Sequence, residues 1–324
     1  MRLSLSKFLQ LKFNVFIYQN LGMGLACLYI MLLGKLYFFF NRNEKYKIED
    51  AVETVFAVSK NRSEINLIKK NVLQGIYYHY YEKFFNAYEN VEALKKFFET
   101  SIEAPFLRKL DSALKNGRGV LFVTGHYGGI EYIPIFLALK KYPISVIAKF
   151  KTKELKHTLY LKTKDLGLEI IDAGEKNGTL QSIIKDLGRN RIVFIECDEI
   201  EEWKPSQKEK MFFLQKIIGV DRTINLIHRK TGSEVIFGIL HRFNLRKYGL
   251  VIENCQDLLS RCNQSSSSAG ETVLKYLEQF IYSFPEEWYQ WKHYTDIEAF
   301  PAVGIELKKQ TFTPLFKPAL SEVL

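Results

Sequence analysis

From Gly119 onward the sequence alternates short β-rich runs with helical stretches, and this alternation limits the possible folds more than any other feature. The runs are residues 120–124, 144–148, 168–171, 192–195, 235–239 and 248–253. Strands that alternate with helices predict an α/β fold with a mostly parallel central sheet flanked by helices. We expect the last run to close this sheet as an antiparallel edge strand.

The segment before Gly119 has a different pattern. Apolar residues recur at helical spacing from about Glu49 to Leu114, which predicts a series of helices. Residues 265–270, rich in serine, are expected to form a linker before a final helix. These patterns predict four regions: a membrane-anchoring segment over residues 1–45, a helical lead-in over 46–118, an α/β domain over 119–300 and a C-terminal tail over 301–324.

The N-terminal region contains an apolar run of nearly bilayer length. It extends from Leu21 to Gly34, and after the single Lys35 the apolar character continues to Phe40. Basic residues flank both ends, so the positive-inside rule gives little orientation. This symmetry favours a monotopic or hairpin-like anchor. A tilted span and a buried core helix are the alternatives.

The formal charge of +10 and the pI of about 9.2 suggest an acidic partner. That partner could be a nucleic acid, an anionic bilayer or an acidic carrier protein. The basic residues are scattered beside acidic ones and no nucleic-acid recognition motif is present, so we expect no nucleic-acid binding. The four cysteines match no metal-ligand or redox spacing, which indicates free thiols, no metal site and a folded body facing the cytoplasm.

The strongest candidate site follows the first β-rich run. The segment Gly125–Gly129 contains His126 and leads into a helix-like run whose first turn holds Glu131. Ligands of open α/β sheets bind at the carboxyl ends of strands. A carboxylate bonded to one imidazole nitrogen leaves the other nitrogen free as a general base. Taken alone, such a pair would more often be a capping carboxylate beside a loop histidine.

The residues around His126 and Glu131 support a catalytic role for the pair. Residues 119–131 resemble the signature block of the bacterial lipid A late acyltransferases, in the lysophospholipid acyltransferase superfamily, where His-x4-Glu or His-x4-Asp follows a strand. The resemblance continues in the same order through residues 192–198, 212–223, 226–235 and 282–293, and so spans roughly residues 45 to 295. The chain has Gly129-Ile130 where that family usually has Asn-Trp.

The resemblance implies an enzyme of the bacterial inner membrane that works from the cytoplasmic side. It would move a fatty-acyl group from acyl carrier protein or coenzyme A to a hydroxyl of a lipid A precursor or related glycolipid, without a cofactor. His126 would deprotonate the hydroxyl, Glu131 would orient His126, and an apolar groove would hold the acyl chain. Further candidate substrate-binding residues are Tyr127, Gly128, Gly129, Lys149, Lys164, Asp198, Arg222 and Thr223.

These further residues carry different expectations. The backbone amides of Tyr127 to Gly129 are candidate donors to an oxyanion. Lys149 and Lys164 could bind acceptor phosphates or an acidic carrier protein, although solvated helix charges are the simpler interpretation. Arg222 and Thr223 begin a predicted helix, a place suited to phosphate, and Thr223 could instead cap that helix.

Two other functions compete with this interpretation. A glycerophospholipid acyltransferase of the lysophosphatidate type shares the dyad but usually has Asp at the position of Glu131. Glu131 and the closing Pro285-Glu286 pair favour the lipid A branch. A catalytically silent lipid-binding scaffold could retain the fold and its anchor, but the intact dyad argues against it.

Overall fold

A seven-stranded sheet forms the centre of the molecule. The computed structural model describes residues 4–150, 153–174, 178–261 and 268–301. Neighbouring strands are parallel except for one antiparallel pair, which confirms the predicted mostly parallel α/β sheet. In order across the sheet they are β1 (Ile102–Glu103), β9 (Lys247–Asn254), β8 (Glu234–Asn244), β2 (Val120–Thr124), β5 (Ile192–Glu196), β3 (Ile144–Ala148) and β4 (Glu169–Asp172).

The last strand, β9, differs in one respect from the expectation. It pairs antiparallel with β8, as expected, but it is not at the edge, because the short β1 pairs with its other side in parallel. β1 comes from the end of the helical lead-in, so this early segment completes the sheet. A two-residue strand gives no alternating pattern in the sequence, and for this reason it was not predicted.

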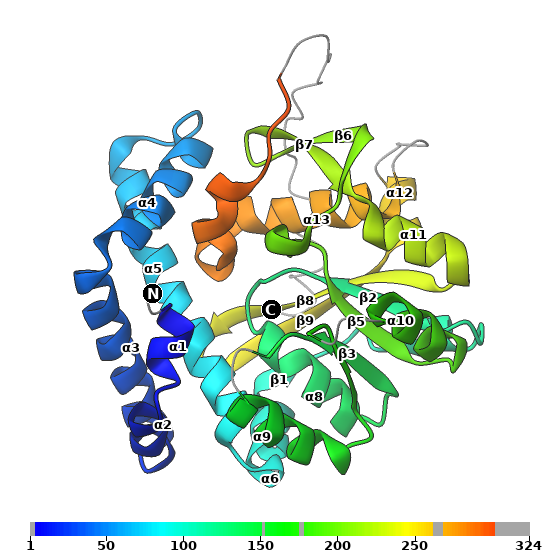
Figure 1. The fold of residues 1–324 in the computed structure, drawn as a ribbon, viewed down its shortest axis with the longest axis horizontal. Coiled ribbons are helices and arrows are strands. Elements are labelled where there is room, and N and C mark those ends of the chain that lie inside the picture. The colour runs from blue at the N-terminus through cyan, green and yellow to red at the C-terminus, as the bar shows by residue number, and fades with distance from the viewer. Residues whose placement is uncertain (1–3, 151–152, 175–177, 262–267, 302–324) are drawn as a thin grey trace.

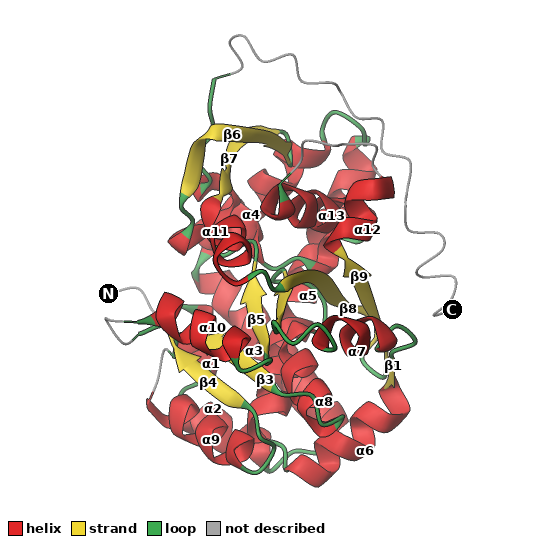
Figure 2. Cartoon of the chain, turned by 90° about the vertical axis from the view of Figure 1, so that its right-hand side faces the viewer, coloured by secondary structure: helices red, strands yellow, loops and turns green. Residues whose placement is uncertain are grey.

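Helices cover both faces of the sheet (Figures 1 and 2). Alternate residues of β2 enter two separate apolar clusters, Val120 and Phe122 on one face and Leu121 and Val123 on the other. The first cluster is completed by α6 (Val91–Ser101), α7 (Arg108–Leu114) and α8 (Ile133–Leu139). The second includes residues of α10 (Thr179–Gly188), α11 (Arg222–Thr231), α12 (Cys255–Arg261) and α13 (Ala269–Ser283), and it continues into the helices before residue 90. Next to the edge of the sheet, α9 (Lys153–Lys164) contacts β4.

A separate antiparallel hairpin, which the sequence did not predict, packs beside α13. It consists of β6 (Pro205–Phe213) and β7 (Lys216–Asp221). Leu214 and Gln215 form the turn with φ angles of 45° and 68°, the left-handed conformation that two-residue hairpin turns require. The Leu214 amide donates to the buried Glu278 carboxylate at 2.6 Å, which holds this turn against α13.

The N-terminal helices form a group beside the sheet, on the left of Figure 1. They are α1 (Leu5–Leu9), α2 (Lys12–Gln19), α3 (Met23–Phe40), α4 (Arg42–Phe56) and the long α5 (Arg62–Tyr88). Within the described residues, no single helix is long and apolar enough to cross a bilayer. The helices over 24–40 and 42–56 meet that test only as a pair bent by 97°. The span that we considered is therefore not confirmed. Residues 302–324 of the tail and 265–267 of the serine-rich linker lie outside the described residues, whereas Ser268 caps the final helix and Ala269 and Gly270 begin it.

A buried ion pair fastens α5 to the sheet. Glu82 is fully buried and accepts from the Arg242 guanidinium, at 2.8 Å between Nη2 and Oε2, and from the Tyr248 hydroxyl at 2.9 Å. We expect Glu82→Gln to lower the free energy of unfolding by about 3–5 kcal/mol, because it leaves the Arg242 charge buried without its partner. Urea denaturation would measure the change. The exposed Glu99→Gln on α6 is the control, expected within about 0.5 kcal/mol of the parent.

Candidate active site

His126 and Asp198 meet at the carboxyl ends of two neighbouring strands. β2 and β5 are parallel and in register, with Thr124 opposite Glu196. His126 and Asp198 each follow two residues after this pair, so both lie just beyond the same edge of the sheet. This is the edge at which ligands bind in open α/β folds, and the position predicted for His126 is therefore the one observed.

Asp198 is the carboxylate that holds the imidazole. Its Oδ1 lies 2.9 Å from His126 Nδ1, and both of its oxygens lie 3.0 Å from the His126 backbone nitrogen. The indole of Trp288 donates to Oδ2 at 2.7 Å. An ionised carboxylate only accepts hydrogen bonds, so Nδ1 carries a proton and Nε2 is the nitrogen available for chemistry. Asp198, which we considered a substrate-binding candidate, thus occupies the position beside the imidazole that we had expected for Glu131.

The charges around His126 favour its protonated form. Burial is the largest influence and lowers the pKa of the imidazole, but Asp198, with Glu196 and Glu199, outweighs it and raises the pKa to about 9. Glu199 Oε2 lies 3.5 Å from Nε2. An imidazolium is the species that forms when Nε2 takes a proton from a hydroxyl, so this site stabilises the product of general-base catalysis.

The segment after Trp288 also contacts His126. The side-chain nitrogen of Gln290 lies 3.1 Å from Nδ1, and the amide of Tyr289 donates to the His126 carbonyl at 3.2 Å. The Tyr289 ring meets the imidazole edge-on, with 5.3 Å between ring centroids. From the sequence we assigned this segment no contact with His126. The sequence offered one signal of its role, namely that the segment lies in the last block of the family resemblance.

The expected dyad between His126 and Glu131 is not formed. No contact between the two side chains is found in the described part of the chain. Glu131 lies on the 3-10 turn η1 (Ile130–Tyr132), and its carboxylate accepts from Lys83 of α5 at 2.8 Å. It also lies 3.7 Å from His79 Nε2, whose ring stacks on Tyr289 at 3.5 Å. The Glu131 carboxylate therefore pairs with a cation on α5. Between Glu131 and His126 lie the stacked rings of His79 and Tyr289.

The amides proposed as oxyanion donors are already used within the protein. The Tyr127 amide donates to Gly125 at 2.7 Å, the Gly128 amide to Glu287 at 2.9 Å and the Gly129 amide to Leu240 at 2.8 Å. The Tyr127 side chain is also fully buried. These three residues therefore fix the turn that carries His126, and the expectation that their amides bind an oxyanion is not supported.

Gly128 is the residue of this turn that tolerates substitution least. Its φ is +56°, and a Cβ atom there would lie 2.1 Å from the Leu240 carbonyl oxygen. We expect Gly128→Ala to lower both the melting temperature and the transfer rate, because backbone must shift where β8 and the turn meet. Thermal unfolding and an acyl-transfer assay would measure this. Gly117→Ala is the control, because its φ of +70° gives similar strain without any atom within 4 Å of the added Cβ.

The remaining candidates do not join His126. Lys149 pairs with Glu202 at 2.7 Å on the surface, and Lys164 is exposed at the end of α9. Asp221, and not Thr223, caps α11, because its side chain accepts from the Thr223 amide at 3.2 Å. No contact of Lys149, Lys164, Arg222 or Thr223 with His126 is found among the described residues, and their proposed roles toward substrate remain predictions.

Two further observations concern what the site holds. The described residues contain no group of three or more His, Cys, Asp or Glu side chains that could bind a metal ion. Two cavities in the described part of the chain lie near the junction of α3 and α4, and neither is lined by His126. The apolar groove that we expected beside His126 therefore remains a prediction.

The fold and the site define an α/β enzyme with a histidine and a carboxylate at the carboxyl edge of its sheet, arranged for proton transfer. A sequence model of the family described as bacterial lipid A biosynthesis acyltransferase matches residues 8–293, and the chain belongs to this family. It is therefore an acyltransferase that transfers groups other than aminoacyl groups. A comparison with curated proteins found no significant match.

Proposed function

We propose that the chain transfers a fatty-acyl group from an acyl thioester to a hydroxyl of a lipid A precursor or a related glycolipid. The donor would be acyl carrier protein or acyl-coenzyme A. The observation that carries this proposal is the Asp198–His126 pair, which leaves Nε2 as the available nitrogen in a member of an acyltransferase family. The family supports an acyl donor and a lipid acceptor, and the particular donor and acceptor are our proposal.

The proposed reaction needs one proton transfer and one displacement. Nε2 of His126 removes the proton of the acceptor hydroxyl as the oxygen attacks the thioester carbonyl. The Nδ1 bond to Asp198 holds the ring and stabilises the imidazolium. The tetrahedral intermediate then collapses, the carbon–sulfur bond breaks, and the proton on Nε2 passes to the departing thiolate. An ester and a free thiol are the products, and His126 returns to its neutral form.

We also propose that the enzyme works at the cytoplasmic face of the bacterial inner membrane. Large apolar side chains are exposed along the N-terminal helices, among them Phe13 at 71% and Phe16 at 65% on α2 and Phe40 at 73% at the end of α3. An exposed apolar face of this kind marks a contact with protein or membrane. A lipid acceptor favours the membrane, since the enzyme must reach it there.

The test is an acyl-transfer assay with a labelled donor and several acceptors. Purified protein would be incubated with labelled acyl carrier protein or acyl-coenzyme A and, in separate reactions, with a lipid A precursor, lysophosphatidate and no acceptor. We expect label in the glycolipid. Label in phosphatidate would instead identify a glycerophospholipid acyltransferase, and no labelled lipid with either donor would favour a silent lipid-binding protein.

A further inference from the structure

A cavity of about 400 Å³ lies where α3, α4 and α5 meet, outside the site of His126. Its volume is within the range of small-molecule sites. Its walls combine cations with apolar and aromatic side chains, among them Lys35 and Phe38 from α3, Arg42 and Lys45 from α4, and Leu73 and Tyr77 from α5. Such a mixture fits a ligand that has an anionic group beside an apolar part.

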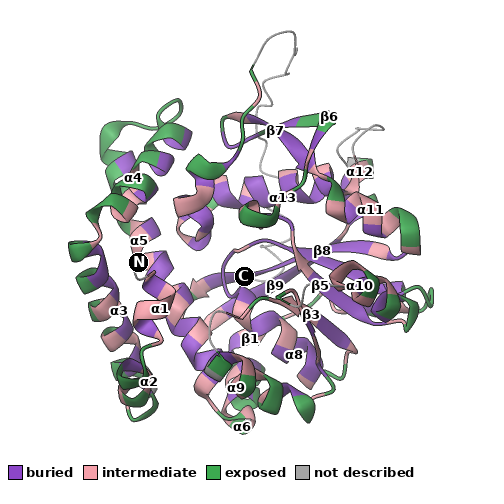
Figure 3. Cartoon of the chain, in the orientation of Figure 1, coloured by how far each residue is buried: buried purple, intermediate pink, exposed green. Residues whose placement is uncertain are grey.

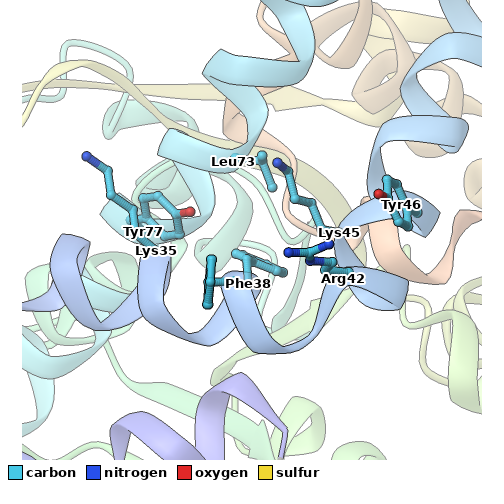
Figure 4. Close-up of a pocket in the computed structure, with 8 residues that line it drawn as sticks. Lys35, Phe38, Arg42, Lys45, Tyr46, Leu73 and Tyr77 are labelled. Carbon is cyan, nitrogen blue, oxygen red and sulfur yellow. The ribbon is translucent and has the colours of Figure 1, made fainter.

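The cations of α4 point into this cavity. Figure 4 shows Arg42 and Lys45 extending from the start of α4 into the space between α3 and α5. Arg42 lies 5.7 Å from the Phe39 ring, and its guanidinium has no carboxylate partner among the residues that the structure describes. Lys45 lies 3.6 Å from Glu49, a partly exposed pair of small energetic value. The nearby Glu44 carboxylate is taken by the Tyr37 hydroxyl at 2.6 Å. The cavity therefore has positive charge available for an anion.

The Tyr77 hydroxyl faces the same space. Tyr77 is only 7% exposed overall, and it lines the cavity. In Figure 4 it points toward the side of the cavity that holds Arg42. The ring lies against Gly34, where a Cβ atom would come within 2.5 Å of it, so its position is fixed by close packing of α3 on α5. A hydroxyl that lies beside cations at the wall of the cavity can donate a hydrogen bond to an anion held there, such as a phosphate oxygen.

The cavity continues into an exposed apolar face. On α3 the exposed side chains follow helical spacing along one side of the helix, and they are Leu25, Leu28, Leu32, Leu36 and Phe39. Phe39 also lines the cavity. Figure 3 shows exposed residues along the outer side of α3. The acyl chains of a molecule whose anionic group sits between Arg42 and Lys45 would thus meet apolar surface and not water.

We propose that this cavity binds the headgroup of an anionic bilayer phospholipid, with its phosphate at Arg42, Lys45 and the Tyr77 hydroxyl and its acyl chains beside the α3 face. The proposal rests on the membrane association proposed above and not on the transfer reaction. Bidentate guanidinium–phosphate bonds make arginine suited to this role. The cavity would fix the enzyme on the membrane surface in one orientation, whereas the apolar face alone would allow several.

Vesicle flotation with the full-length protein tests the proposal. One set of vesicles would be pure phosphatidylcholine, which is neutral. The other would contain about one third phosphatidylglycerol, so that its surface is negatively charged like an anionic leaflet. We expect Arg42→Gln/Lys45→Gln to weaken binding to the anionic vesicles at least tenfold. Tyr77→Phe, which changes no charge, should weaken it about threefold. The matched control Lys47→Gln/Lys70→Gln removes two exposed charges from α4 and α5 that do not line the cavity.

Three results would overturn the proposal. Equal losses in the two double variants, with no loss in Tyr77→Phe, would show only diffuse electrostatic attraction. Equal binding of the parent to neutral and anionic vesicles would show that no anionic headgroup is recognised. Competition by soluble glycerol 1-phosphate at micromolar concentration would identify a site for free phosphate esters. Transfer to an acceptor in detergent micelles should be unchanged in every variant, so failure of the proposed reaction would be seen separately.

Discussion

Replacing His126 by alanine is expected to reduce the rate of acyl transfer by about 10²–10⁴-fold, the usual contribution of a general base. In its neutral form the imidazole can take the hydroxyl proton at Nε2, since Nδ1 is held by Asp198. The fold should survive, because the His126 side chain is partly accessible at 17%, and Asp198 keeps its bonds to the Trp288 indole and to the backbone of residue 126. Single-turnover transfer from a labelled thioester would measure the rate, and circular dichroism would check the fold.

His157→Ala provides the matched control for this loss. His157 lies on α9 with an exposed side chain, so its removal should leave the transfer rate within about twofold of the parent. If His126→Ala retained more than about a tenth of the parent rate while folded, the imidazole could not be the general base. The chemistry would then have to be sought elsewhere along the sheet edge.

The positions of the main strands could be predicted because each is a short run of β-branched and aromatic residues with its own local pattern. β2, β3 and β5 begin and end within a residue of the predicted runs. His126 could be placed for the same reason, since the residue that follows a buried parallel strand must lie at the edge of the sheet. These predictions needed only the neighbouring sequence.

The partner of His126 could not be predicted in this way. Asp198 reaches the imidazole because β5 lies beside β2 in a particular register, and Trp288 completes the site from a segment more distant still along the chain. Glu131 is the nearest acid along the sequence after His126, but its carboxylate accepts a hydrogen bond from Lys83 of α5 and not from His126. Sequence distance therefore gave the wrong carboxylate, although Asp198 was among the candidates.

The prediction of oxyanion donors was not supported for a related reason. A glycine-rich turn before a helix suggests backbone amides that are free to bind a ligand. The amides of Gly128 and Gly129, however, already donate hydrogen bonds to the carbonyls of Glu287 and Leu240. These partners come from η3 (Pro285–Glu287) and β8, which no local pattern connects with the turn. The close approach that the glycines permit is thus used for packing of the protein on itself.

If Asp198 raises the pKa of His126, it should set the pH dependence of transfer as well as its rate. With a pKa of about 9, the neutral imidazole becomes scarcer by about tenfold for each pH unit below 9, so transfer by the parent should rise with pH up to about 9 and then level off. Asp198→Asn removes the charge that raises this pKa, and the rising limb should move to lower pH. The rate on the plateau should still fall by about 10²–10⁴-fold, because an amide neither fixes the Nδ1–H tautomer nor stabilises the imidazolium.

Glu131→Gln separates this explanation from the dyad suggested by the sequence. Asp198, Glu196 and Glu199 are the neighbours that raise the pKa of His126, and Glu131 is not among them. Whatever its effect on rate, Glu131→Gln should therefore leave the rising limb near pH 9. Rates of transfer measured from pH 6 to 10 for both variants would decide between the carboxylates. A limb that moved in Glu131→Gln and stayed in place in Asp198→Asn would return the orienting role to Glu131, since only the carboxylate that bonds the imidazole can shift its titration so far.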